Sequence, residues 1–137
     1  MSGSKLVRLS FSIEEDLNEK FETLVREHGY GNRSEYIRDM IRKQLTRRCC
    51  AAGGDVIGTI SCLYDPEKPG LLLKLLALRK ASPVLVLGDT RSLLKEGVCS
   101  EMLMVRGKGS DIRALAESMR KQMGVLQTEF VITSPSM

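Results

Sequence analysis

The sequence predicts an α+β protein with two domains, a strand–helix–helix (βαα) unit followed by a βαββαβ unit. In residues 8–13 polar and apolar residues alternate strictly, which is the period of a strand with one exposed and one buried face. Two helical patterns follow, and after a run of small residues the strand and helix patterns come in the order βαββαβ. We therefore expect one domain over residues 1–48, a linker over 49–54 and a second domain over 55–137.

The composition limits the class of protein. The chain has 137 residues, 42% of them hydrophobic and 28% charged, which is enough to form a core and excludes disorder by composition. Its net charge of +4 allows an acidic partner without requiring one. We find no apolar run long enough for a membrane span and no signal-peptide core, so we expect a cytoplasmic protein. The four cysteines lack the spacing of a disulfide framework, which indicates reduced thiols.

The first strand has no partner strand within its own domain. Its apolar positions would face a core, and its exposed positions are Arg8, Ser10 and Ser12. Because an unpaired strand edge is costly, the same strand of a second copy is the expected partner, which makes a homodimer. A two-stranded ribbon of this size fits the major groove of DNA. On pattern alone, residues 8–13 could also be an ordinary edge strand.

Two helices follow the strand. Ser12 and Glu15 match a capping box for the first helix, and Gly29 is placed to end it. The second helix is expected to start after Asn32 or Ser34, both good N-caps. Apolar residues recur at helical spacing in both helices: Leu17, Phe21, Leu24, Val25, Tyr36, Ile37, Met40, Ile41 and Leu45. The basic side chains from Arg38 to Arg48 fit a solvated helix face, and the Asn32–Glu35 segment could be a cap alone.

The second domain reads as alternating strands and helices. Strands are expected over residues 55–64, 84–87, 102–105 and 125–133, with a turn at Lys95-Glu96-Gly97. A helix over 70–80 carries six leucines, too many for one buried stripe, so we expect it to pack on the sheet and on another subunit. Ser110-Asp111 is expected to cap the last helix, whose apolar face is Ile112, Leu115, Ala116, Met119 and Met123. This order is the ferredoxin-like arrangement.

Several segments carry a family resemblance. Residues 5–48 resemble a ribbon-helix-helix DNA-binding domain, and residues 29–39 (GYGNRSEYIRD) are similar to the same segment of the NikR nickel-responsive regulators. The segments 64–68 (YDPEK) and 99–101 (CSE) extend the resemblance to the ACT-like domain of that family. The resemblance implies a regulator that binds operator DNA as a ribbon homodimer and assembles into a homotetramer through its C-terminal domains.

The resemblance also implies which residues contact DNA. The outward ribbon positions that read base edges in the family fall on Arg8, Ser10 and Ser12. Arginine can bond a guanine edge in bidentate fashion, and a serine hydroxyl can donate or accept. Arg33 and Ser34 lie at a helix N-terminus, where backbone amides and the helix dipole favour a DNA phosphate.

The residues depart from the family at its nickel site. That site is square-planar, with three histidines and one cysteine across a subunit interface, a donor set that suits Ni(II). The cysteine matches Cys99, but the histidine positions fall near Lys80, Arg91 and Leu93. The only histidine of the chain is His28, in the first domain. Since arginine keeps its proton and lysine would have to lose one, we expect the high-affinity nickel site to be absent and predict no cofactor.

Other ligands remain open. Cys99 with Cys62 or the pair Met102/Met104 could form a soft-metal site, or Lys80, Arg91 and Cys99 could hold an anion or small metabolite. The site could also bind nothing, with Cys99 a buried core residue. The Gly107–Ser110 turn could hold a phosphate or be a plain turn.

Two acidic residues of the first domain also have two interpretations. Glu35 and Asp39 match positions where the family can hold a weak cation. They also fit acidic residues near a helix N-terminus that stabilise the helix dipole.

The function that follows is a sequence-specific DNA-binding transcriptional regulator whose nickel response is lost or replaced. The alternative is a metabolite-binding ACT-like module without specific DNA binding. We predict no enzyme and no catalytic residues, because His28 lies far in sequence from every cysteine and no nucleophile–base pair can be named.

Overall fold

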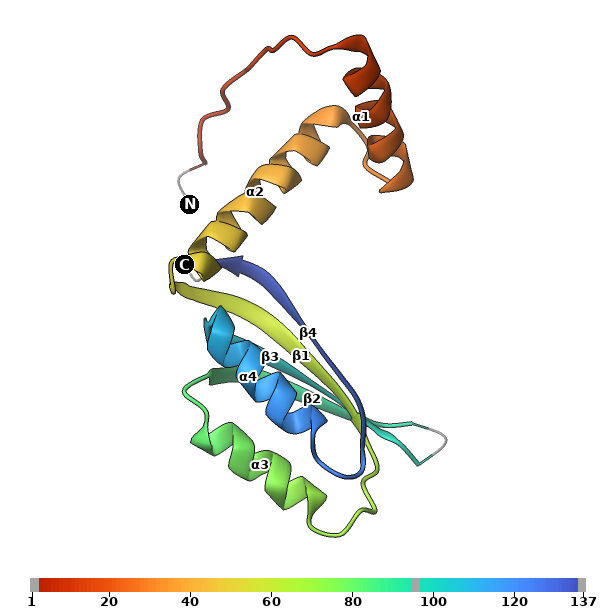
Figure 1. Ribbon diagram of the computed structural model, residues 1–137, viewed down its shortest axis with the longest axis vertical. Helices are drawn as coiled ribbons and strands as arrows, with labels where there is room; N and C mark the ends of the chain where they lie inside the picture. Colours follow the sequence, from red (N-terminus) through yellow and green to blue (C-terminus); the bar gives the residue numbers. More distant parts are fainter. Residues whose placement is uncertain (1–2, 95–96, 136–137) are drawn as a thin grey trace. The chain divides into compact units, whose positions relative to one another are not determined.

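The computed structural model describes residues 3–94 and 97–135. Figure 1 shows its helices and strands. In chain order they are α1 (Glu15–Glu27), α2 (Arg33–Ala51), β1 (Asp55–Tyr64), α3 (Leu71–Ala81), β2 (Leu85–Leu93), β3 (Cys99–Lys108), α4 (Gly109–Arg120) and β4 (Val125–Pro135). The chain divides into two compact units between Met40 and Ile41, so α2 contributes to both.

The N-terminal unit contains α1 and the first half of α2, preceded by a segment without regular structure. Residues 3–14 form neither helix nor strand in the single chain, and all of them are exposed. The strand expected over 8–13 is therefore not seen here. A strand is defined by hydrogen bonds to a neighbouring strand, and no strand of the described N-terminal unit is available to supply them.

The caps of the two helices show one wrong prediction and one correct one. Helix α1 has Glu14 as its N-cap, with no side-chain cap hydrogen bond, so the Ser12–Glu15 capping box is wrong. Ser12 lies too far before the first turn, and Glu15 is the first helical residue rather than the third. Asn32 does cap α2, because its Oδ1 accepts a hydrogen bond from the backbone N–H of Glu35 at 2.9 Å. Gly29 follows α1 with φ +70°, as expected.

A small aromatic cluster joins α1 to the start of α2. The ring of Tyr36 meets Phe21 and Tyr30 edge-on, with centroid distances of 5.5 and 5.0 Å. Val25 is the one buried hydrophobic residue in the described part of this unit. The unit therefore has little core of its own.

The C-terminal unit is built on a four-stranded antiparallel sheet with the order β2-β3-β1-β4. This is the ferredoxin-like βαββαβ arrangement that the sequence predicts. Strands β2 and β3 are longer than expected, because their pairing continues from Leu85 to Leu93 and from Cys99 to Lys108. Of the predicted turn, Lys95 and Glu96 lie outside the described residues, and Gly97 has φ +74°.

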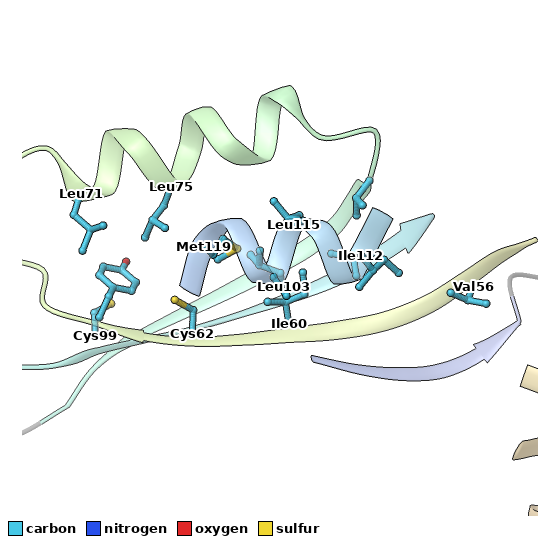
Figure 2. Close-up of a cluster of buried hydrophobic side chains, with 14 residues drawn as sticks. Val56, Ile60, Cys62, Leu71, Leu75, Cys99, Leu103, Ile112, Leu115 and Met119 are labelled. Atoms are coloured by element: carbon cyan, nitrogen blue, oxygen red, sulfur yellow. The ribbon is translucent and has the colours of Figure 1, made fainter. Parts of the chain in front are cut away.

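Helices α3 and α4 cover one face of this sheet. Figure 2 shows Leu71 and Leu75 of α3 and Ile112, Leu115 and Met119 of α4 directed at the strands that carry Ile60 and Leu103. Only Leu71 and Leu75 of the six leucines in α3 are fully buried, while Leu72, Leu73 and Leu76 are exposed. This fits the expectation that α3 is too apolar for one packed stripe.

Helix α4 begins earlier than predicted. It starts at Gly109 with Lys108 as N-cap and no side-chain cap hydrogen bond, so the Ser110–Asp111 cap is wrong. Ile112, Leu115, Ala116 and Met119 are buried as predicted. Met123 is exposed, because the helix has ended at Arg120.

The predicted linker is partly helical. Residues 49–51 form the last turn of α2, and both Cys49 and Cys50 pack against the core of the C-terminal unit. The chain then turns at Gly53, with φ +73°, and enters β1 at Asp55. The domain limits 1–48 and 55–137 stay predictions. In the described part of the chain, no helix is both long and apolar enough to cross a membrane.

Candidate functional site

The predicted base-reading residues lie on an open segment. Arg8, Ser10 and Ser12 are exposed, as are the apolar residues between them, with Leu9 82% exposed. Five exposed apolar side chains line this segment: Leu6, Val7, Leu9, Phe11 and Ile13. An alternating apolar row that its own unit does not cover is suited to pairing with another copy.

The predicted phosphate-contacting residues lie at the start of α2. Arg33 and Ser34 are both exposed. Arg33 forms an ion pair with Glu22 of α1 through Nη2 and Oε1, and the Arg33 side chain remains largely exposed. Asn32 satisfies the N–H of Glu35, so one of the orphan amides of the helix is used by the cap. An anion bound at this position would contact both the N-terminus of α2 and the guanidinium of Arg33.

The candidate weak cation site is one turn of α2. Glu35 is exposed, and Asp39 accepts a hydrogen bond from the hydroxyl of Tyr30 through Oδ2. Among the described residues, no group of three or more His, Cys, Asp or Glu side chains is placed to hold a metal ion. His28 is the C-cap of α1 and its Nδ1 lies 2.9 Å from the carbonyl oxygen of Leu24.

Cys99 lies in the packed core at the start of β3. It pairs with Tyr64 on β1 and with Leu93 on β2, and its side chain is buried between the sheet and the helices. This agrees with the interpretation of Cys99 as a small core residue.

A buried carboxylate lies two residues further along β3. Glu101 is only 4% exposed and accepts three hydrogen bonds. The donors are Tyr64 Oη at 3.2 Å, Arg79 Nη1 at 3.1 Å and Arg91 Nε at 3.2 Å. Arg79 also donates through Nη2 to Asp89 Oδ2 at 3.1 Å. We call these five residues, Tyr64, Arg79, Asp89, Arg91 and Glu101, the Glu101 cluster.

The cluster joins one helix to three strands. Tyr64 is on β1, Arg79 on α3, Asp89 and Arg91 on β2, and Glu101 on β3. Of these, only Arg91 was predicted from the sequence as a possible ligand-binding residue. The sequence signal that could have identified this cluster is a glutamate at an inward-facing position of the alternating strand 99–105. A buried carboxylate needs hydrogen-bonding partners.

Burial and charge alter the acid–base behaviour of this region. Burial raises the pKa of the Tyr64 hydroxyl, and its contacts with Cys99 and Glu101 raise the pKa further. Burial also raises the pKa of the Cys62 thiol, partly offset by a hydrogen bond from Thr128. For Arg91, burial lowers the pKa, but the nearby Glu101 carboxylate outweighs this effect, so the net pKa is raised. All three groups therefore favour their protonated forms.

The strand register places the thiols and the methionines of the possible soft-metal site on opposite faces of the sheet. Cys62, Cys99 and Glu101 face the helices, while Met102 and Met104 lie on the opposite face and are 53% and 54% exposed. A site combining Cys99 with Met102 or Met104 is therefore wrong, because alternate residues of a strand point to opposite faces.

Two further possible ligand positions are Lys80 and the Gly107–Ser110 turn. Lys80 is exposed near the end of α3, whereas Arg91 lies on β2 with its Nε bonded to Glu101. At the Gly107–Ser110 turn, a Cβ atom on Gly109 would lie 3.1 Å from the Sγ of Cys50, so this approach to the α4 N-terminus is already packed.

Comparison with known proteins identifies the family. The sequence model of the "Ribbon-helix-helix protein, copG family" matches residues 7–48, and that of the "NikR C terminal nickel binding domain" matches residues 57–133. The chain belongs to the NikR family. It is therefore a DNA-binding regulator, and the prediction that it is not an enzyme follows from this membership.

Relatives across the NikR family match nearly the whole chain. A protein of Pyrococcus abyssi described as "Putative nickel-responsive regulator" is 35% identical over 94% of this chain and 94% of its own length. A protein of Thermococcus kodakarensis with the same description is 33% identical over the same shares. The C-terminal fold is similar to the ACT domain from GTP pyrophosphokinase of Chlorobium tepidum, with a TM-score of 0.50, 19% identity, and coverage of 56% of this chain and 99% of that one. The predicted α+β fold class is confirmed.

Proposed function

We propose that this NikR-family regulator binds a specific operator as a homodimer whose paired residues 8–13 insert as a ribbon into the major groove. The observation that carries this proposal is the exposed apolar row of residues 3–14, which the described part of the N-terminal unit leaves uncovered. Pairing with the same segment of a second copy buries that row and turns the alternate polar side chains outward.

The roles of the polar residues follow from their chemistry. Arg8 bonds a guanine edge, and Ser10 and Ser12 donate to or accept from neighbouring bases. Arg33 and Ser34 hold a phosphate at the N-terminus of α2, which sets the register of the ribbon on the duplex. Two such dimers, joined through the C-terminal domains as a homotetramer, place two ribbons on one two-fold-symmetric operator.

The nickel response is lost or replaced by that of another effector. At the family's ligand positions the chain has Lys80, Arg91 and Leu93 beside Cys99. Arg91 is a permanent cation already bonded to Glu101, and Leu93 has no donor atom. These residues do not fit a square-planar nickel site, which needs imidazole nitrogens beside the thiolate.

Two smaller sites are part of the proposal. An anionic metabolite held by Lys80 and Arg91 beside Cys99 would bind Arg91 on the side away from Glu101, because Glu101 occupies its Nε. A weak cation at Glu35 and Asp39 would share Asp39 with the Tyr30 hydroxyl.

Operator selection tests the DNA-reading role. Binding sites are selected from random duplex DNA with the wild type, and the selected site is then titrated with Arg8→Ala. We expect a loss of about 1–3 kcal/mol in specificity, concentrated at one or two base pairs. Lys20→Ala, which removes an exposed cation of α1, is the control and should keep the base preference. Unchanged base preference in Arg8→Ala would remove the ribbon-reading proposal.

Metal titration tests the lost nickel response. Protein purified without a histidine tag is dialysed against Ni(II), Cu(I) and Zn(II), and bound metal and operator affinity are both measured. We expect no tight stoichiometric nickel binding and no nickel-dependent change in operator affinity. Tight nickel binding at one ion per chain would show that the site persists with other ligands.

The same experiments separate the alternative function. A metabolite-binding ACT-like module without specific DNA binding would yield no selected operator, and would bind an amino acid or a nucleotide in calorimetry.

A further inference from the structure

An ion pair holds one of the predicted phosphate-contacting side chains in the single chain. Arg33, the first residue of α2, pairs through Nη2 with Oε1 of Glu22 in α1. Glu22 Oε1 is buried, whereas the side chain of Arg33 stays 63% exposed. Glu22 is therefore the inner partner of the pair, and the guanidinium of Arg33 is the outer one.

The packing of α1 against the start of α2 brings this pair together. The ring of Phe21, the residue before Glu22, meets the ring of Tyr36 edge-on. Tyr36 lies three residues after Arg33, so the two side chains share one side of α2. Tyr36 also meets Tyr30 in the turn between the helices. Because these aromatic contacts fix the two helices against each other, the Glu22 carboxylate is held within reach of Arg33.

The guanidinium of Arg33 can bond a second anion while it is paired with Glu22. Arginine carries five N–H donors in a planar fork, and the ion pair with Glu22 engages Nη2. Its other donors can reach an oxygen on the exposed side. The amides at the start of a helix have no acceptor within that helix, so a phosphate at the N-terminus of α2 meets them as well.

We propose that Glu22 is a positioning residue for DNA binding: it holds the Arg33 guanidinium at the N-terminus of α2, where the guanidinium bridges the Glu22 carboxylate and a DNA phosphate. This inference rests on the phosphate contact of Arg33 in the proposed function. A long side chain that is already held in place loses less conformational entropy when it binds. Glu22 thereby strengthens operator binding without touching DNA.

Alanine substitutions at two acidic residues of α1 test the positioning role. In the full chain, Glu22→Ala and Glu19→Ala each remove one negative charge from the same helix and introduce the best helix former. Glu19 is exposed and lies three residues before Glu22, so its variant is the control for the loss of charge alone. Both variants are titrated with the selected operator at several salt concentrations.

We expect Glu22→Ala to bind the operator roughly 2–12-fold more weakly than Glu19→Ala. This factor corresponds to about 0.5–1.5 kcal/mol for immobilising one long side chain on binding. Equal operator affinity of the two variants would overturn the proposal.

Neutral phosphates locate the effect on the DNA. Operator duplexes in which single phosphates are replaced by uncharged methylphosphonates are bound by the wild type and by each variant. At least one replacement in each half-site should weaken the wild type and have no effect on Arg33→Ala. Glu22→Ala should respond less than the wild type to that same replacement, and Glu19→Ala should respond fully. A full response of Glu22→Ala would contradict the positioning role.

A charge swap distinguishes positioning from a purely structural role. Glu22→Arg combined with Arg33→Glu restores an ion pair between α1 and α2 but removes the guanidinium from the start of α2. We expect the swap to regain the thermal stability of the wild type while its operator affinity stays as low as that of Arg33→Ala. Recovery of operator affinity in the swap would mean that the pair only joins the two helices.

Arg33→Ala separates this inference from the proposed function. If Arg33→Ala binds the operator like the wild type, the phosphate contact of the proposed function is refuted. If Arg33→Ala binds more weakly while Glu22→Ala equals Glu19→Ala, the positioning role of Glu22 alone is refuted.

Discussion

The two units of this chain place their apolar side chains in opposite ways. In the C-terminal unit, residues of β1, β3, α3 and α4 form one continuous buried core. In the described part of the N-terminal unit, Val25 is the one buried hydrophobic residue, while Leu9, Phe11 and Leu17 are exposed. The C-terminal unit therefore has the core of a stable single chain, whereas the N-terminal unit exposes an apolar surface that our proposal pairs with a second copy.

The polar groups follow the same division. Glu101 is buried in the C-terminal unit because two arginines and a tyrosine satisfy it. In the N-terminal unit Arg8, Ser10 and Ser12 are exposed and free to meet DNA. In the C-terminal unit the charged groups hold helix and strands together. In the N-terminal unit, by our proposal, the polar groups contact DNA.

The largest expected effect is a core substitution in the C-terminal unit. Leu103→Ala removes a side chain with no exposed surface and should lower the free energy of unfolding by about 2–5 kcal/mol. Met104→Ala, the next residue on the exposed face, should cost far less. Denaturant unfolding measures both, and equal losses would mean that the open face is covered in solution.

Glu101→Gln tests the buried cluster. It keeps the shape of the side chain but removes the negative charge between Arg79 and Arg91, so we expect a loss of about 1.5–3 kcal/mol in the free energy of unfolding. Glu129→Gln, an exposed carboxyl of β4, should change stability little. A Glu101→Gln variant as stable as wild type would show that the cluster is not a stabilising element.

Phe11→Ala tests the half-core of the N-terminal unit. Because Phe11 is exposed in the single chain, its contribution should appear only on association, as a loss of about 1–2 kcal/mol per chain in ribbon dimerisation. Ser12→Ala, on the polar side, should dimerise normally. Concentration-dependent sedimentation of both variants measures this, and equal dimerisation of Phe11→Ala and the wild type would contradict the proposed contrast between the two units.

The smallest expected effect is a pH dependence from Tyr64. Its pKa is raised above the ordinary value of 10.0 by burial and by its neighbours, so the folded state holds the phenol proton more tightly than the unfolded chain. Its contribution to stability is complete below pH 10 and is lost as the pH rises from there towards the folded-state pKa. Tyr64→Phe should cost about 1 kcal/mol at pH 7. The stability gap between wild type and variant should shrink above pH 10, and a constant gap in unfolding experiments from pH 7 to pH 11 would contradict this.

Local patterns were sufficient for much of the fold. A run of β-branched residues predicts β1, helical spacing predicts the buried face of α4, and Asn32 is the cap that its residue type indicates. The Ser12–Glu15 and Ser110–Asp111 caps were wrong, because a capping motif identifies a helix start only when the backbone places that residue at the N-cap. The predicted strands 84–87 and 102–105 were too short, because the length of a strand depends on a partner strand that is distant in sequence.

The sequence by itself determined the NikR resemblance, the alternation of residues 8–13 and the presence of a single histidine, His28, since each depends only on which residue stands at a position. Only the tertiary structure decided that Glu101 is the centre of a cluster. Its donors Tyr64, Arg79 and Arg91 lie 37, 22 and 10 residues away in the chain. Strand register and helix packing bring them together, and these depend on non-local contacts that no window of the sequence contains.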